Sequence, residues 1–282
     1  MVILRTASAV AAWRANPSRG SVGFVPTMGA LHAGHLTLVA RSVRENARTI
    51  ASVFVNPTQF GPKEDFSRYP RPFARDRRLL VSAGVDALFY PTPAVMYPDG
   101  FATTVTVSGL TATLCGAPTS RGPAHFAGVA TVVAKLFGVV RPDRAYFGLK
   151  DFQQVRVIEQ MTADLNLGVR VVRCATVREA DGLAMSSRNA YLSVEDRALA
   201  PRLHVSLQQG AKLLLSKRNM SPKTVTGAVK NALASTKRIQ IEYVELVHPI
   251  SLQSLKVARR PALLAAAVRL GHTRLIDNVL VP

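Results

Sequence analysis

The segment Gly23-Phe-Val-Pro-Thr-Met-Gly-Ala-Leu-His-Ala-Gly-His35 decides the fold of the N-terminal half of this chain. Its apolar run up to Pro26 is typical of a buried strand, the glycine after it favours a turn, and a helix is predicted to start near Ala33. A helix that begins directly after a strand offers free backbone N–H groups and the positive end of its dipole. Gly29 and Gly34 let a ligand approach this backbone closely. We therefore expect polyphosphate to bind at this turn.

Two histidines at the predicted helix start are candidates for chemistry. His32 and His35 lie on one face of a helix because they are three residues apart. An isolated pair of this kind more often caps or packs a helix, so the assignment depends on two further segments. In the first of these, Phe147-Gly-Leu-Lys-Asp151, the lysine can neutralise phosphates at a strand end before a helix. Asp151 could instead be only an N-cap.

The second segment is the loop Asp181-Gly-Leu-Ala-Met-Ser-Ser-Arg188. Its small residues, two hydroxyls and arginine suit it to hold phosphate oxygens that reorganise in a transition state, although Ser-Ser-Arg alone is also a common surface turn. No GxxxxGK(S/T) or GxGxxG sequence occurs in the chain. Neither a P-loop NTPase nor a dinucleotide-binding Rossmann domain is therefore supported, and a nucleotide must bind through another design.

The secondary structure expected along the whole chain indicates two domains. The first half alternates short β-rich runs with helical segments, which indicates βαβ units around a parallel sheet. Its expected strands are 21–26, 49–55, 87–90, 144–147 and 170–177. The remainder of the chain predicts a long helix over 194–215, a basic polar linker over 216–223 and a second helix after that linker. Three β-rich segments follow, at 239–247, 262–268 and 273–279. The expected fold class is α/β: a Rossmann-like parallel-sheet domain over 1-176 and a smaller α+β domain over 177-282.

The amino-acid composition indicates in which cellular compartment the protein functions. With 282 residues, 48% of them hydrophobic, the chain can bury a real core. No apolar run reaches the roughly 20 residues that a bilayer requires, so we expect a soluble protein without a membrane contact. Residues 1–17 predict an opening strand and helix rather than a leader, because Arg5 interrupts them. Cys115 and Cys174 are too few and too far apart to indicate disulfides or a zinc site, which favours the reducing cytoplasm.

The formal net charge of +19 would suit a polyanionic partner. Charge alone does not identify that partner. The basic residues are scattered in runs no longer than pairs, and Trp13 is the only tryptophan. Basic arms and stacking platforms are therefore both missing, and we expect nucleic-acid binding not to be the main function.

The motifs taken together resemble a known family. The H-x-G-H sequence after a first strand and the later Met-Ser-Ser-Arg are similar to the HIGH and KMSKS pair of the nucleotidyltransferase superfamily. More narrowly, nearly the whole chain resembles the pantothenate synthetases. The resemblance is carried by Val25-Pro-Thr-Met-Gly-Ala-Leu-His-x-Gly-His35, Phe54-Val-Asn-Pro-x-Gln-Phe60, Arg68-Tyr-Pro-Arg71, His125-Phe126 with Gly128, Phe147-Gly-x-Lys-Asp-x-Gln-Gln154 and Asp181-Gly-Leu-Ala-Met-Ser-Ser-Arg-Asn189.

This resemblance implies that pantoate and β-alanine are condensed at the expense of ATP through a pantoyl-adenylate, with Mg²⁺ on the phosphates and no metal held by a protein site. It also implies a cytoplasmic homodimer whose C-terminal domain is a lid. The implied catalytic residues are His35 as proton donor, His32, Lys150, Ser186, Ser187 and Arg188. The implied ATP-binding residues are Met28, Gly29, Ala30, Leu31, His32, Ala33, Gly34, His35, Gly148, Leu149, Lys150, Asp151, Val177, Met185, Ser186, Ser187 and Arg188.

The implied pantoate-binding residues are Gln59 and Gln154, with Gln59 also near β-alanine. An amide suits this role because it donates and accepts hydrogen bonds without a fixed charge beside a nucleophile. Without the family, Gln59 would be read as a polar residue of an Asn-Pro loop. Asn56, Tyr69 and His125 are expected in the same pocket, although Tyr69 and His125 could equally be half-buried packing residues.

The chain also departs from the family pattern. Cys115 and Leu149 stand where glutamate is frequent, and Ala127 stands where arginine is common. The stretch 117–124 is longer than the loop expected before His-Phe, so Arg121 is not assigned to the site. Two other functions stay open: adenylyl or cytidylyl transfer to another acceptor, which the Gln59 and Gln154 motifs oppose, and a basic nucleic-acid-binding module on an inactive nucleotide fold. Intact His32, His35, Lys150 and Arg188 oppose the latter.

Overall fold

The computed structural model describes residues 1–15, 20–62, 64–216 and 220–282. These residues form two compact units. The first unit consists of Met1–Val107, Pro123–Leu149 and Gln154–Ala175, and the second consists of Ser108–Gly122, Lys150–Gln153 and Thr176–Pro282. The division of the chain into functional domains 1-176 and 177-282 stays a prediction.

The first unit is built on a six-stranded sheet in which every described pairing is parallel. The strand order is β1-β4-β3-β2-β5-β6. This architecture confirms the predicted α/β class with its Rossmann-like parallel sheet, and the strands match the β-rich runs of the sequence. Their bounds are β1 (Val2–Leu4), β2 (Val22–Thr27), β3 (Arg48–Val53), β4 (Ala87–Phe89), β5 (Arg144–Gly148) and β6 (Arg170–Cys174).

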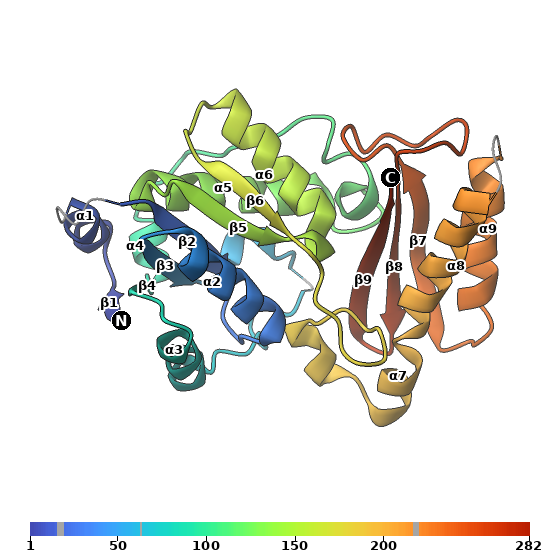
Figure 1. Cartoon of the computed structure of the whole chain (residues 1–282), viewed down its shortest axis with the longest axis horizontal. Coiled ribbons are helices and arrows are strands. Elements are labelled where there is room, and N and C mark those ends of the chain that lie inside the picture. Colours follow the sequence, from blue (N-terminus) through green and yellow to red (C-terminus); the bar gives the residue numbers. More distant parts are fainter. Residues whose placement is uncertain (16–19, 63, 217–219) are drawn as a thin grey trace. The chain divides into compact units, whose positions relative to one another are not determined.

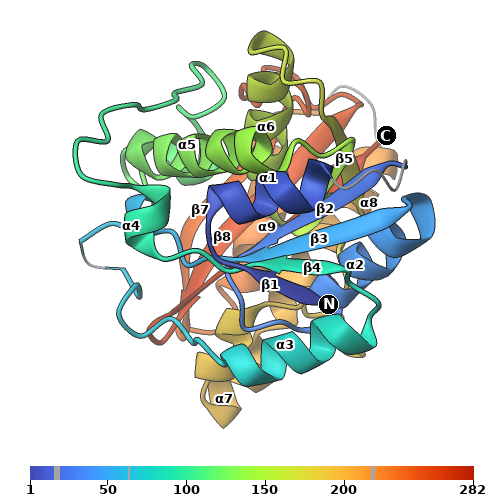
Figure 2. The same ribbon diagram turned by 90° about the vertical axis from the view of Figure 1, so that its left-hand side faces the viewer.

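Helices cover both faces of this sheet. The helices α2 and α3 lie on one face, and α1 and α5 lie on the other (Figure 2). Side chains from both faces are buried, as a parallel sheet requires. The helices are α1 (Ala7–Ala15), α2 (Ala33–Glu45), α3 (Phe73–Ser82), α4 (Pro93–Met96), α5 (Pro123–Val140) and α6 (Phe152–Asp164), with the 3₁₀ turn η1 (Pro57–Gln59). A second turn, η3 (Leu149–Asp151), lies between β5 and α6, and a third, η2 (Leu114–Gly116), belongs to the second unit.

Among the described residues, α5 alone is long and apolar enough to cross a membrane, with 18 residues and a mean hydropathy of 1.5. More than half of it is buried inside the protein. Its Phe137 ring packs edge-on against Phe24 of β2 and Phe147 of β5. These contacts identify α5 as a core helix of the first unit.

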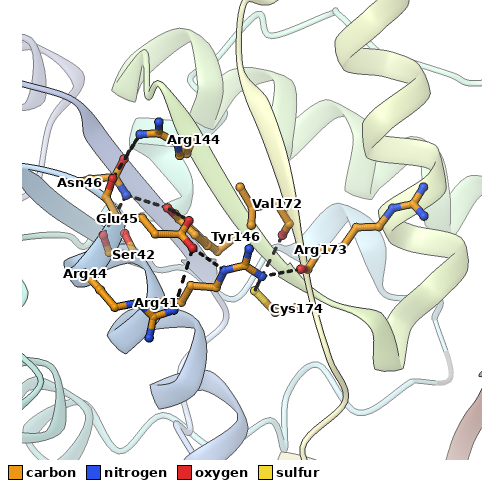
Figure 3. Close-up of polar contacts among 10 residues, drawn as sticks. All are labelled: Arg41, Ser42, Arg44, Glu45, Asn46, Arg144, Tyr146, Val172, Arg173 and Cys174. Atoms are coloured by element: carbon orange, nitrogen blue, oxygen red, sulfur yellow. Dashed lines mark hydrogen bonds and ion pairs between the residues drawn. The ribbon is translucent and has the colours of Figure 1, made fainter.

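A polar network attaches the C-terminal end of α2 to the sheet (Figure 3). Tyr146 of β5 is fully buried, and its hydroxyl donates to Glu45 Oε2 at 3.0 Å and accepts from Asn46 Nδ2 at 2.7 Å. Arg41 donates to Glu45 Oε1 at 2.8 Å and to the backbone carbonyl of Arg173 at 2.8 Å. The hydrogen bond from Arg41 holds the pKa of the Glu45 carboxyl below its usual value. The direction of α2 is thereby fixed against β5 and β6.

The second unit confirms the predicted smaller α+β fold. Its antiparallel sheet has the order β7-β8-β9, and α8 and α9 lie side by side along one face (Figure 1). Gly210 permits this packing, because a Cβ at that position would lie 2.6 Å from Val229 Cγ2 and 2.7 Å from Leu264 Cδ2. The bounds are η4 (Ser187–Tyr191), α7 (Val194–Leu199), α8 (Arg202–Ser216), α9 (Pro222–Leu233), β7 (Ile239–Val247), β8 (Ala262–Leu270) and β9 (Thr273–Val281).

The expectation of one long helix over 194–215 is wrong. The segment forms α7 and α8, which are separated at Ala200 and Pro201. Pro201 has no N–H to donate to the preceding turn and its ring crowds that turn, so the helix stops and restarts. The predicted linker 216–223 lies partly outside the described residues, since 217–219 are not described, and its last two residues begin α9.

The network at the end of α2 predicts a specific loss of stability. Tyr146→Phe keeps the buried ring but leaves Asn46 and Glu45 without the hydroxyl. We expect this variant to lose about 1 to 2 kcal/mol of unfolding free energy. That loss corresponds to a melting temperature lower by about 2 to 8 °C, to be measured by calorimetry.

Tyr90→Phe is the matched control, because the described residues offer no hydrogen-bond partner to the Tyr90 hydroxyl, while its ring stacks on Phe73. This control is expected to melt within about 1 °C of the unchanged protein. Equal melting temperatures for the two variants would show that the Tyr146 hydroxyl does not anchor α2.

Candidate functional site

Three neighbouring strands of the first unit bring predicted site residues to one edge of the sheet. Met28 follows β2, Asn56 lies shortly after β3, and Gly148 is the last residue of β5. Because β2 is parallel to both of its neighbours, their carboxyl ends lie on the same side. The chain continues from β2 to β3 on one side and returns later to β5 on the other. The carboxyl ends of β2 and β5 therefore form a topological switch point, where ligands bind in open α/β sheets.

The turn between β2 and α2 is held by a buried carboxylate. Gly29 and Ala30 both have left-handed backbone angles, with φ of 83° and 50°. Asp76 of α3, which is 1% exposed, accepts from Ala30 N at 2.8 Å and from Leu31 N at 2.9 Å. The expectation that this turn offers free backbone N–H groups is therefore wrong for Ala30 and Leu31.

His32 and His35 cap the start of α2, as the alternative interpretation foresaw. His32 Nδ1 accepts from Gly34 N at 3.1 Å, so the N–H of Gly34 is not free either. His35 Nδ1 accepts from His32 N at 3.4 Å, and the ring centroids are 4.0 Å apart. Since each Nδ1 accepts, each neutral ring carries its proton on Nε2. The caps therefore prepare both imidazoles as hydrogen-bond donors, and capping does not exclude chemistry.

Gln59 and Asn56 lie together in a buried amide chain. Asn56 is 1% exposed and Gln59 is 8% exposed. Asn56 Nδ2 donates to the carbonyl of Gly128 and to Gln59 Oε1, both at 3.1 Å. A carbonyl oxygen can only accept, so the orientation of Asn56 is determined, and with it that of Gln59. Gln59 consequently presents Nε2, which donates to Met28 Sδ at 3.0 Å, toward the turn after β2.

A tyrosine that the sequence did not single out completes this chain. The hydroxyl of Tyr97 donates to Asn56 Oδ1 at 2.7 Å. Burial raises the pKa of Tyr97, so the phenol stays protonated and continues to donate. Thr58 Oγ1 also donates to Asn56 Oδ1, at 3.0 Å. The amide chain is thus fixed at the end opposite to Met28.

Two further predicted pocket residues belong to the same part of the fold. His125, at the start of α5, is buried, and its Nδ1 lies 2.8 Å from the backbone oxygen of Gln59. Tyr69 is 4% exposed and packs edge-on against Phe60 at a centroid distance of 6.0 Å. His125 therefore supports the loop that carries Gln59, and the Tyr69 ring packs beside it. The assignment of both residues to the pantoate pocket stays a prediction.

Gln154 lies half-buried in the first turn of α6. Its neighbour Gln153, in the second unit, has a structural role, because it donates to the carbonyls of Leu110 and Thr113 at 2.8 and 2.7 Å and accepts from Cys115 N at 3.0 Å. Gln154 keeps its place among the predicted substrate ligands.

The remaining predicted residues lie around the β5 end and in the second unit. Gly148 ends β5 and Leu149 begins η3. Lys150 Nζ lies 3.7 Å from Asp151 Oδ2, and the Lys150 carbonyl accepts from Asn278 Nδ2 at 3.0 Å. The lysine is therefore attached to β9 through its backbone, and its side chain is held beside a carboxylate.

The second unit brings Val177 and Met185 together. Met185 N donates to the carbonyl of Val177 at 3.0 Å, and Arg178 and Ala184 pair as an antiparallel bridge. Ser186 follows as the N-cap of η4, where its hydroxyl accepts from Arg188 N at 3.2 Å. Ser187 and Arg188 begin η4. The five predicted residues of this segment, Val177, Met185, Ser186, Ser187 and Arg188, thus form one hairpin and the turn after it.

A buried ion pair supports this hairpin. Arg178 donates to both oxygens of Asp277 at 2.7 and 3.0 Å and to the carbonyl of Gly182 at 3.1 Å. Burial alone would raise the pKa of Asp277, but the contacts with His204 and Arg178 outweigh it and hold the pKa below its usual value. Asp277 therefore stays ionised at neutral pH and fixes the hairpin to β9.

The match to known proteins extends over the whole of this architecture. A family model described as pantoate-beta-alanine ligase matches residues 2–280. The chain belongs to this family. Curated relatives named pantothenate synthetase include that of Moorella thermoacetica, 50% identical over 100% of this chain and 99% of the relative. That of Acetivibrio thermocellus is 51% identical over 92% of this chain and 91% of the relative.

Solved structures of ligases in this family have the same fold. Pantothenate synthetase from Thermus thermophilus matches with a TM-score of 0.93 and 49% identity, covering 100% of this chain and 99% of that one. The ligase from Francisella tularensis, complexed with beta-gamma ATP and β-alanine, matches with a TM-score of 0.80 and 31% identity, covering 99% and 97%. The assignment of individual site residues stays a prediction.

Sequence reasoning missed two residues at this edge of the sheet, Asp76 and Tyr97. Asp76 lies in the charged segment Arg75-Asp76-Arg77-Arg78, whose pattern is that of a solvated helix face. Tyr97 lies in a Tyr-Pro turn that carried no chemical signal. The role of a fully buried polar residue depends on its hydrogen-bond partners. The partners of Asp76 and Tyr97 are distant in the sequence, so no local pattern indicates them.

Proposed function

We propose that this chain condenses (R)-pantoate with β-alanine to give pantothenate, using ATP and releasing AMP and pyrophosphate through a pantoyl-adenylate. Family membership over residues 2–280 supports the overall reaction. The observation that carries the nucleotide half is the histidine pair at the start of α2, beside the switch-point strand, with both Nδ1 atoms occupied as acceptors. That arrangement suits an acceptor-rich ligand such as a polyphosphate.

In the first half-reaction a carboxylate oxygen of pantoate attacks the α-phosphorus of ATP. The bond from that phosphorus to the pyrophosphate oxygen breaks, and negative charge grows on the leaving group. Hydrogen bonds from His35 and His32 Nε2 would stabilise this charge while the rings remain neutral. A neutral donor suits the position, because a helix N-terminus disfavours an imidazolium. Lys150 would neutralise phosphate charge in both the ground state and the transition state.

In the second half-reaction the amine of β-alanine attacks the acyl carbon, and AMP leaves with one oxygen of the former carboxylate. Gln59 supports both halves because its amide orientation is fixed. Its Nε2 can donate to a carboxylate or hydroxyl oxygen, while its oxygen is already bonded to Asn56. Gln154 would provide the second amide for pantoate. Ser186, Ser187 and Arg188 would hold phosphate oxygens as the first half-reaction proceeds.

Mg²⁺ is best treated as part of the Mg–ATP substrate. The described residues contain no group of three His, Cys, Asp or Glu side chains that could hold a metal. Mg²⁺ commonly keeps several waters and binds through substrate phosphates with one or two carboxylates. Asp151, whose side chain is 47% exposed, is the carboxylate nearest in sequence to the phosphate lysine and fits that role.

Assembly and compartment complete the proposal. A cytoplasmic homodimer is the state that the family resemblance implies, and the two buried thiols without a disulfide suit a reducing compartment. The C-terminal part, 177-282, would act as a lid that brings Met185 to Arg188 to the nucleotide. The small-molecule partners are pantoate, β-alanine and ATP.

The order of product release tests the reaction sequence. Enzyme mixed with Mg–ATP and pantoate, without β-alanine, should release pyrophosphate in a rapid burst of about one per active site, because the adenylate stays bound. Adding β-alanine should restore steady turnover and AMP formation. Rapid-quench separation of AMP, ADP and pyrophosphate measures both. Steady formation of ADP and phosphate would show an acyl-phosphate route and overturn the adenylate.

A second prediction separates the chemical role of His35 from its capping role. His35→Ala removes the proposed donor and should slow pyrophosphate release by at least about a hundredfold. It also removes the long cap contact with His32 N and the ring contact with His32, so the melting temperature should fall by no more than about 4 °C. Single-turnover pyrophosphate release and calorimetry measure the two effects.

His248→Ala is the matched control. His248 Nδ1 accepts from Ile250 N at 3.3 Å and from Ser251 N at 3.4 Å in a turn after β7. The control therefore loses the same kind of backbone contact outside the proposed site, and it should keep near-normal turnover. If His35→Ala turned over normally and only melted earlier, His35 would be a cap alone.

A further inference from the structure

Three consecutive backbone N–H groups of the turn after β2 are satisfied by side chains of the protein. Gly29 N donates to Thr27 Oγ1 at 3.1 Å, and Thr27 Oγ1 itself donates to the carbonyl of Ser52 at 2.8 Å. The next two N–H groups, those of Ala30 and Leu31, donate to the two oxygens of Asp76. The turn is therefore folded around Thr27 and Asp76 rather than left open for an anion.

The local conformation explains why such partners are needed. Ala30 adopts a left-handed backbone angle, with φ of 50°, which is strained for a residue that carries a Cβ. Ala30 is 8% exposed and Leu31 is 1% exposed, so water cannot replace a lost partner for their N–H groups. A Cβ on Gly29 would lie 3.0 Å from Asp76 Oδ2, which shows how closely the carboxylate approaches the turn.

We propose that Asp76 is a positioning residue for nucleotide binding: its carboxylate holds the Met28–Leu31 turn in the strained conformation that orients His32 and His35 toward ATP. This inference rests on the proposed function. Asp76 contacts the backbone of the turn and need not contact ATP itself. Its position on α3, 46 residues from Ala30, joins the helix after β3 to the start of α2.

For a variant that lacks the Asp76 charge, the proposal predicts weaker ATP binding, whereas charge repulsion alone predicts stronger binding. A carboxylate close to bound phosphates repels them, so removing its charge would by Coulomb attraction alone strengthen ATP binding. Asp76→Asn has nearly the same shape but offers one oxygen and one NH₂ group to two backbone donors. One N–H of the turn then faces another donor, and the turn relaxes.

The test compares Asp76→Asn with Asp86→Asn in steady-state and single-turnover assays. Asp86 Oδ2 accepts from Thr49 N at 2.7 Å near the amino end of β3, at the sheet edge opposite to the proposed site. We expect Asp76→Asn to raise KM for ATP at least about tenfold, with a smaller change in KM for pantoate, because one buried N–H of the turn loses its acceptor. Asp86→Asn should lower the melting temperature without changing KM for ATP.

An unchanged or lower KM for ATP in Asp76→Asn would overturn the proposal. If that variant does not fold, Thr27→Val tests the same turn, since it removes the acceptor of Gly29 N while keeping the side-chain volume. It should raise KM for ATP in the same direction by about three- to tenfold, and an unchanged KM would again overturn the proposal. Failure of the proposed function is separate: the unchanged enzyme would then form no AMP from ATP, pantoate and β-alanine.

Discussion

The parallel pairing of β2 with both β3 and β5 is the constraint on which the first unit depends. Parallel pairing brings the carboxyl ends of the three strands to one edge, and the chain reverses its direction of sheet growth at β2. The turn before α2, the Asn56–Gln59 loop and Gly148 consequently meet at a switch point. The network of Arg41, Glu45 and Tyr146 holds the far end of α2, so the start of this helix keeps a fixed direction (Figure 3).

Polar groups at this edge are oriented by hydrogen bonds within the protein. Each Nδ1 of the histidine pair accepts a backbone N–H, the amide of Gln59 is oriented through Asn56, and Asp76 satisfies two buried N–H groups. Groups that are already oriented need little reorganisation when charge develops on a ligand, which is the main source of electrostatic catalysis. The same contacts stabilise the local backbone. The proposed chemistry of His32 and His35 would therefore use the same contacts that cap α2.

Most of the fold could be predicted from the sequence, because strand and helix periods are local signals. The β-rich runs and the helix start at Ala33 correspond to described elements, whereas the apolar period continued through Pro201 and suggested one helix. The motifs likewise indicated which side chains could take part in chemistry. Contacts between distant residues determine how these side chains are oriented. Asp76 occupies N–H groups that the local motif left free, and the carbonyl of Gly128 sets the donor orientation of Gln59 through its amide neighbour.

The central claim is that ATP activates the pantoate carboxylate as an adenylate, and an oxygen label tests it most directly. Pantoate with both carboxylate oxygens replaced by ¹⁸O is incubated with enzyme, Mg–ATP and β-alanine, and the products are analysed by mass spectrometry. The account predicts one ¹⁸O in each AMP and one in the amide of pantothenate, because the carboxylate oxygen that attacks the α-phosphorus leaves with AMP. AMP without label, or label in inorganic phosphate accompanied by ADP, would contradict it.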